Sequence, residues 1–135
     1  MFAKLFITLG ALTFGLGVPF LEINPSHVFN QDWTPHARIH EVWQLMTNSA
    51  LAVMCLWLVW ARGQIILPAI VGLTITAGFL VAFVIRGSYG GSMKYLDGSE
   101  KQVLGINMGV LGFSIVTLLF IAAIVMNVRQ TRLEN

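Results

Sequence analysis

The sequence predicts an all-α fold, a bundle of four transmembrane helices that forms one integral membrane domain over residues 1–135. Hydrophobic residues make up 56% of the chain and charged residues only 10%, and the mean hydropathy is +0.77. Soluble domains carry roughly 25% charged residues. Four segments are also long enough to cross an apolar core of roughly 30 Å, which takes about 20 helical residues. Helices are expected because an isolated strand in lipid would leave its backbone groups unpaired.

The four spans are expected near residues 2–21, 39–60, 65–85 and 102–127. The first is interpreted as an uncleaved helix rather than a secretion signal, because its apolar run continues to Leu21 and three more spans follow. Before the second, Thr34 and Pro35 form a favourable helix start, with threonine as the N-cap and proline at the first helical position. The short segment 61–64 makes the second and third spans antiparallel neighbours. The sequence therefore predicts a single up-and-down bundle.

Glycines recur in the third and fourth spans. Small residues at such spacings let membrane helices approach closely, so close packing is the expected role. The alternative is that some of them make room for a ligand. The residues concerned are Gly72, Gly78, Gly105, Gly109 and Gly112.

Charge and cysteine content exclude several classes of function. The net charge of +2 arises from 8 basic and 6 acidic residues that are scattered singly, which gives no support to nucleic-acid binding. Cys55 is the sole cysteine, so no disulfide forms within the chain. Basic residues flank the spans equally on both sides. Cytoplasmic termini in a bacterial inner membrane are favoured, because one side collects five of the acidic residues: Glu22, Asp32, Glu41, Asp97 and Glu100.

The segment 33–44, which opens the second span, carries the chemistry of the chain. Ionisable groups are costly at membrane depth, so a cluster there is a candidate functional site. His36 and His40 are four residues apart and share a helix face, as in two-histidine metal sites. The alternative for His36 is an exposed interfacial position. His40 and Glu41 are also suited to proton transfer, because histidine titrates near neutrality and a carboxyl group at low dielectric can hold a proton.

Further polar residues extend the same face of the second helix. Gln44, Thr47 and Asn48 follow His40 along it, and Arg38 lies just off it, where it could reach a propionate, a phosphate or a lipid headgroup. Such a face must point at protein, at a cofactor or at a water-filled cavity. Asn107 in the fourth span could close a cavity from the other side. The polar third loop, residues 86–101, is either simply solvated or a lid over the cavity.

Two resemblances are carried by these residues. The run 30–40, NQDWTPHARIH, resembles a family of small uncharacterised four-helix membrane proteins with a Trp-x-Pro-His-Ala-Arg-x-His signature. More distantly, the layout resembles styrene oxide isomerase, a small four-helix membrane enzyme of bacteria. The shared features are FGLG at residues 14–17, a polar first loop, ARIH at residues 37–40 and a glycine-rich third loop.

The second resemblance implies a homo-oligomer, a trimer, that holds haem b with His40 as the axial ligand. The ferric iron would act as a Lewis acid that opens an epoxide to a carbonyl compound. Arg38, Trp43 and Gln44 are the other residues expected to contact the haem. Asn48 is the candidate for positioning the substrate, although it lies two residues further from the histidine than in that family. The tyrosine that the family carries on its third helix has no counterpart in residues 65–85.

Three hypotheses of function follow. The first is a membrane-embedded isomerase that converts a small hydrophobic substrate, of the epoxide-to-carbonyl type, with haem b on His40. The second is a non-enzymatic membrane subunit, or a module that binds a lipid or another hydrophobic ligand. The third is a cofactor-free acid–base isomerase that uses His40 and Glu41. The candidate catalytic residues are His40, Glu41, Asn48 and Asn107, and the candidate metal ligands are His36 and His40.

Overall fold

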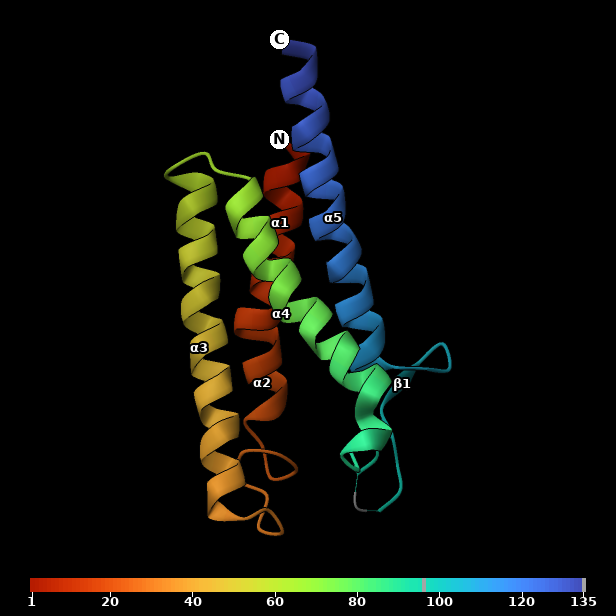
Figure 1. Ribbon diagram of the computed structural model, residues 1–135. Helices are drawn as coiled ribbons and strands as arrows, with labels where there is room; N and C mark the ends of the chain where they lie inside the picture. Colours follow the sequence, from red (N-terminus) through yellow and green to blue (C-terminus); the bar gives the residue numbers. More distant parts are fainter. Residues whose placement is uncertain (96, 135) are drawn as a thin grey trace.

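Four long helical segments make up most of the computed structural model, which describes residues 1–95 and 97–134 (Figure 1). The first segment consists of α1 (Phe2–Leu12), a π-helical stretch η1 (Thr13–Gly17) and α2 (Val18–Glu22). The others are α3 (Pro35–Trp60), α4 (Ile66–Ile85) with the 3-10 turn η2 (Arg86–Ser88), and α5 (Met108–Glu134). Each segment is long and apolar enough to cross a membrane, so the four predicted helical spans are confirmed as helices.

The start of α3 follows the predicted capping. Thr34 lies outside the helix with a ψ of 149°, and its Oγ1 accepts a hydrogen bond of 3.2 Å from the backbone N–H of Ala37. Pro35 occupies the first helical position, where its missing N–H costs nothing. The helix therefore begins four residues before the expected span at residue 39.

The fourth helix begins later than expected, because residues 102–107 form a small hairpin. The strands β1 (Gln102–Val103) and β2 (Ile106–Asn107) pair antiparallel. Leu104 and Gly105 join them with φ values of 55° and 76°. Positive φ at both central residues is typical of a tight hairpin turn and ends any helix. The expectation that the fourth span starts at residue 102, with Gly105 as a helix-packing residue, is therefore wrong.

The tightest packing surrounds Phe120 of α5, which is fully buried. A Cβ added to Gly10 of α1 or to Gly72 of α4 would collide with the Phe120 ring. The ring therefore fills space that two glycines leave open on two other helices. Gly72 confirms the predicted packing role of small residues.

A second close contact joins the first segment to α3. A side chain on Gly15 would collide with Ala52, so the two helices touch through their smallest residues. The hydroxyl group of Ser49 strengthens this contact with a hydrogen bond of 2.8 Å to the carbonyl oxygen of Gly15. Between α4 and α5, the hydroxyl group of Thr117 donates to that of Thr76 at 2.9 Å.

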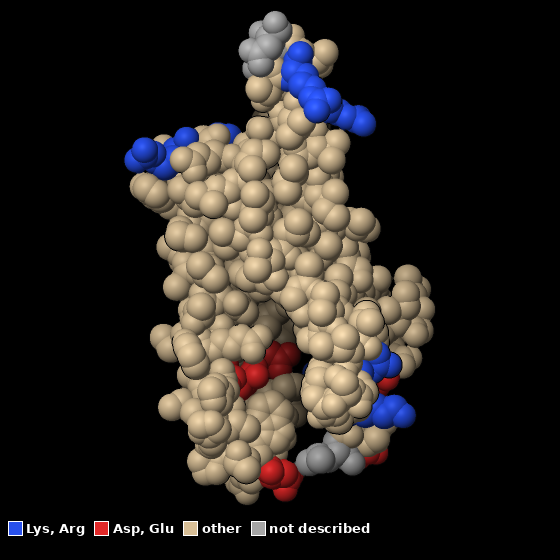
Figure 2. Space-filling view, in the orientation of Figure 1, with Lys and Arg blue, Asp and Glu red and all other residues tan. Residues whose placement is uncertain are grey.

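The two ends of the bundle differ. The buried core cluster lies in the half of the bundle near the termini, with Ile7, Cys55, Val59 and Ala69 among its members. Toward the other end α4 runs obliquely away from α3, and the first and third loops lie there (Figure 1). The molecule is hollowed in that half, with acidic side chains visible inside (Figure 2). This hollow is the candidate site.

Candidate functional site

The hollow is a cavity of about 1280 Å³ that opens between the helices and the two loops. Its walls come from η1, α2, the first loop, α3, α4, the third loop and the start of α5. One part is apolar and includes Leu45, Ile75, Phe79 and Phe113. The rings of Phe79 and Phe113 stack there with centroids 4.5 Å apart. The polar part is lined by Glu22, His27, Asp32, Glu41, Asn48 and Lys101.

Glu41 of α3 lines this cavity and is half-buried. Within the part of the chain that the structure describes, its carboxyl group has neither a hydrogen bond nor an ion pair. The nearest charges that act on it are those of Glu22 and His27. A carboxyl group that faces the cavity without a partner is available to hydrogen bond with a bound molecule.

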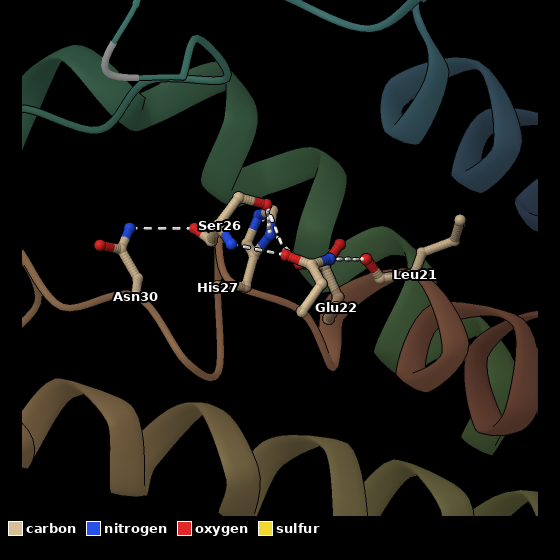
Figure 3. Close-up of polar contacts among 6 residues, drawn as sticks. Leu21, Glu22, Ser26, His27 and Asn30 are labelled. Carbon is tan, nitrogen blue, oxygen red and sulfur yellow. Dashed lines mark hydrogen bonds and ion pairs between the residues drawn. The ribbon is translucent and has the colours of Figure 1, made fainter.

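Glu22 and His27 form a close side-chain pair in the lining of the cavity. The Nε2 atom of His27 lies 2.9 Å from Oε2 of Glu22, and about a quarter of each side chain is exposed (25% and 27%). Glu22 is the last residue of α2, and the turn that follows brings His27 back over it (Figure 3). The fold thereby brings the imidazole of His27 and the carboxyl groups of Glu22 and Glu41 to the same cavity.

The aromatic residues around His27 connect the first loop to the third. Its ring makes edge contacts with Trp33 and Tyr95, at centroid distances of 5.9 Å and 6.0 Å. Burial lowers the pKa of His27, the negative charge of Glu41 acts to raise it, and Lys101 lowers it further. The neutral imidazole is therefore favoured at the site. Residues of the third loop, Lys94, Tyr95 and Lys101 among them, form one wall of the cavity, which fits the lid alternative.

The predicted pair His40 and Glu41 is not brought together. His36 and His40 are both exposed on the outside of α3, and their Nε2 atoms are hydrogen bonded at 3.0 Å. His40 lines a separate, shallow groove of about 340 Å³ with Trp43, Gln44, Thr47 and Asn48. Adjacent residues of a helix point about 100° apart, which separates the two side chains.

Of the residues expected to hold haem b, His40, Trp43 and Gln44 line this outer groove, and Gln44 also lines the cavity. Arg38 lines neither. His40, Trp43 and Gln44 are exposed and form a single wall, whereas a pocket normally encloses most of its ligand. One chain therefore does not enclose a haem, and a second copy would have to supply the other wall. For the predicted metal site, the described residues contain no group of three or more metal-binding side chains, so His36 and His40 are a pair without a third ligand.

The two candidate asparagines have different surroundings. Asn48 lines both the cavity and the outer groove. Asn107 lies at the cavity edge, and its Oδ1 accepts hydrogen bonds from the N–H groups of Gly109 and Val110 at 2.9 Å and 3.1 Å. Its Nδ2 donates to Glu100 at 2.9 Å. Asn107 therefore caps α5, and its amide group is already occupied.

The sequence pattern did not single out His27 as a site residue, and it placed Glu22 among the acidic residues on one side of the membrane. The signal that could have found them is a carboxyl group at the end of an apolar span, followed five residues later by a histidine in a short polar loop. Comparisons with protein-family models, curated proteins and solved structures found no match to this chain. Its function is therefore inferred from the geometry of the cavity.

Proposed function

We propose that the chain is an integral membrane protein that isomerises a small hydrophobic substrate by acid–base chemistry inside the cavity. The observation that carries this proposal is Glu41. Its carboxyl group lies within an apolar helix and lines the cavity, and no described residue pairs with it or hydrogen bonds to it. Such a group is costly for folding, and contact with a bound molecule accounts for it.

The lining of the cavity supports a hydrophobic substrate. The stacked rings of Phe79 and Phe113, together with Leu45 and Ile75, offer an apolar surface, and titratable groups line the same cavity. A substrate with an apolar body and one reactive polar group matches this combination. Apolar pockets with a few placed polar groups are typical of small-molecule sites.

The roles of the residues follow from proton balance. The pair of Glu22 and His27 delivers a proton to the substrate, and Glu41 accepts one from it. A proton then passes from Glu41 back to the pair through water in the cavity, which returns the protein to its starting state. With an epoxide, the proton on the ring oxygen breaks one carbon–oxygen bond. A hydrogen then shifts with its electron pair to the electron-deficient carbon, and the oxygen gives its proton to the acceptor as the carbonyl group forms. Substrate and product have the same atoms.

The test is turnover of an aryl epoxide by the detergent-purified protein, with the aldehyde measured by gas chromatography. Glu41→Gln keeps the size of the side chain and is expected to lower the rate by about 10²–10⁴-fold. Glu100→Gln is the matched control, because Glu100 bonds to Asn107 and does not line the cavity. Unchanged turnover in Glu41→Gln contradicts the proposal. Epoxide binding without turnover in the wild type favours the non-enzymatic ligand-binding alternative.

A second candidate function is also an isomerase, but its active site lies on the outer surface of α3, at an interface between two copies of the chain. The observation in its favour is the exposure of His40 and Trp43, whose rings lie 5.9 Å apart beside the outer groove. In a homo-oligomer, such as the trimer that the resemblance implies, haem b on His40 would supply Lewis-acid chemistry. A Soret band that disappears in His40→Ala, together with lost turnover, supports this candidate. Turnover that survives His40→Ala and chelation supports the acid–base enzyme.

The placement of charge supports an orientation as well. At the end near the termini, the Nζ atom of Lys4 lies 5.5 Å from the Trp60 ring, and the guanidinium group of Arg62 lies 5.5 Å from the Trp57 ring. Basic and aromatic residues are typical of a membrane–water interface, and basic groups mark the cytoplasmic side. Basic side chains lie at both ends, whereas the acidic side chains in this view lie at the end with the first and third loops (Figure 2). We therefore place the termini in the cytoplasm, in a bacterial inner membrane, which labelling of single added cysteines tests.

A further inference from the structure

A chain of three short contacts begins at the cavity and runs into the first loop (Figure 3). Glu22 contacts the Nε2 atom of His27, and the Nδ1 atom of His27 contacts the hydroxyl group of Ser26 at 2.9 Å. The same hydroxyl group lies 2.6 Å from Oδ1 of Asn24. Because each atom in this chain has limited donor and acceptor capacity, the contacts decide where the protons lie.

The starting point is the amide group of Asn24. The backbone N–H of Ser26, which can only donate, lies 2.7 Å from Oδ1 of Asn24. At the other side of the amide group, Nδ2 donates to the carbonyl oxygen of Leu21. Both neighbours therefore require the same orientation, in which an oxygen atom faces Ser26.

The hydroxyl group of Ser26 comes next. An amide oxygen only accepts, so the Ser26 hydroxyl must donate its single hydrogen to Asn24. Toward His27 it can then only accept, which requires a hydrogen on Nδ1 of the imidazole. In the neutral ring this leaves Nε2 as a bare acceptor that faces Glu22 at 2.9 Å.

We propose that Asn24 and Ser26 are positioning residues that hold His27 with a proton on Nδ1, so that Nε2 and the Glu22 carboxyl group share a single proton. The shared proton is the one that the pair exchanges with the substrate. This inference rests on the proposed function for its role in turnover, but the protonation pattern itself does not depend on any substrate.

The charged and titratable groups around the pair allow this arrangement. Glu41 approaches from α3 and Lys101 from the third loop, and these two charges act on His27 in opposite directions. Tyr95 contacts the imidazole ring through an edge and not through a hydrogen bond to its nitrogens. Among the described residues, Ser26 and Glu22 are thus the hydrogen-bond partners of the His27 ring nitrogens.

The test is nitrogen-15 NMR of the imidazole in the full chain, in a variant that carries His36→Gln and His40→Gln. The chain has 3 histidines, so His27 then gives the only imidazole signals. A protonated-type signal for Nδ1 is expected, with Nε2 intermediate between protonated and bare. Glu22→Gln removes the shared proton and should convert Nε2 to a fully bare signal. Protonation of Nε2 with a bare Nδ1 would overturn the proposal.

Substitutions of Ser26 provide a second test of the same protonation pattern. Ser26→Ala removes the acceptor for Nδ1, so a large share of the neutral ring should change to the Nε2–H form, which then donates to Glu22. Ser26→Thr keeps the hydroxyl group and should restore the wild-type signals. Unchanged signals in Ser26→Ala contradict the positioning role.

Turnover of the epoxide separates this inference from the proposed function. Ser26→Ala is expected to lower the rate about tenfold and to shift its pH profile, with recovery in Ser26→Thr. If Glu41→Gln is inactive but the His27 NMR signals do not change in Ser26→Ala, the acid–base function is supported and the positioning role of Ser26 is wrong. If the His27 signals respond but Glu41→Gln stays fully active, the protonation pattern stands and the proposed function is wrong.

Discussion

His40 and Glu41 follow one another on α3 but belong to different surfaces: Glu41 lines the large cavity, and His40 lines the groove on the outside of the helix. Substitutions at these two positions therefore report on two separate sites. The charges of Glu22 and His27, from the first segment and its loop, act on Glu41, although neither residue forms a hydrogen bond or an ion pair with it.

The first prediction concerns the carboxyl groups of the cavity. Glu41→Gln should raise the free energy of unfolding by about 1 kcal/mol, because it removes a half-buried carboxyl group that has no partner among the described residues. Glu22→Gln should lower it by a similar amount, because it weakens the contact with His27. Thermal unfolding in detergent measures both, and equal effects of the same sign would contradict the assignment.

The second prediction tests the packing of Phe120. Gly72→Val should cost about 1–3 kcal/mol, because the new side chain collides with the Phe120 ring. Phe120→Ala alone should cost about 3–5 kcal/mol. In the double variant the valine occupies space vacated by the ring, so the combined loss should be smaller than the sum. Gly87→Ala, where nothing lies within 4 Å, is the control and should change little.

The third prediction concerns the start of α5. Asn107→Ala removes the oxygen that accepts from Gly109 and Val110 and should cost about 1 kcal/mol. Asn107→Asp keeps an accepting oxygen at the helix N-terminus, although it loses the donor to Glu100. Its loss should therefore be smaller. Equal losses in a thermal unfolding experiment would show that the cap contributes nothing.

The fourth prediction is a dependence of stability on pH. The folded state lowers the pKa of His27, mainly through burial, so below about pH 6.5 the unfolded chain takes up a proton at this residue more readily. The free energy of unfolding should therefore fall as the pH decreases below this value. His27→Gln should make the slope shallower in this range. A slope that is the same with and without His27 would assign the effect to other groups.

The helices could be predicted because apolar length is a local property of the sequence. The start of α3 at Pro35 was readable in the same way, from a threonine and a proline. The hairpin at residues 102–107 was missed because the apolar run continues through it, and the turn depends on two positive φ values that only Gly105 signals. Hydropathy does not distinguish a strand pair from the first turns of a helix.

The candidate site was predictable only in part. Glu41 was identified because a carboxyl group within an apolar span is unusual. The neighbouring pair, Glu22 and His27, could not be identified, because its position depends on how α2 and the first loop fold back over the cavity. In the sequence, His40 and Glu41 belong to one polar face of the second helix. In the structure Glu41 faces the cavity and His40 faces the outside. Helical periodicity alone does not show which part of a polar face the neighbouring helices cover.

The burial of Phe120 between two glycines has a consequence for how a ligand arrives. The half of the bundle near the termini is closed by this contact, while the cavity lies in the half that carries the first and third loops. In a bilayer, a hydrophobic compound would then enter from one leaflet only, the leaflet beside those two loops. Turnover in sealed vesicles should accordingly depend on which leaflet holds the substrate, and slow flip-flop across the bilayer would limit supply from the other side.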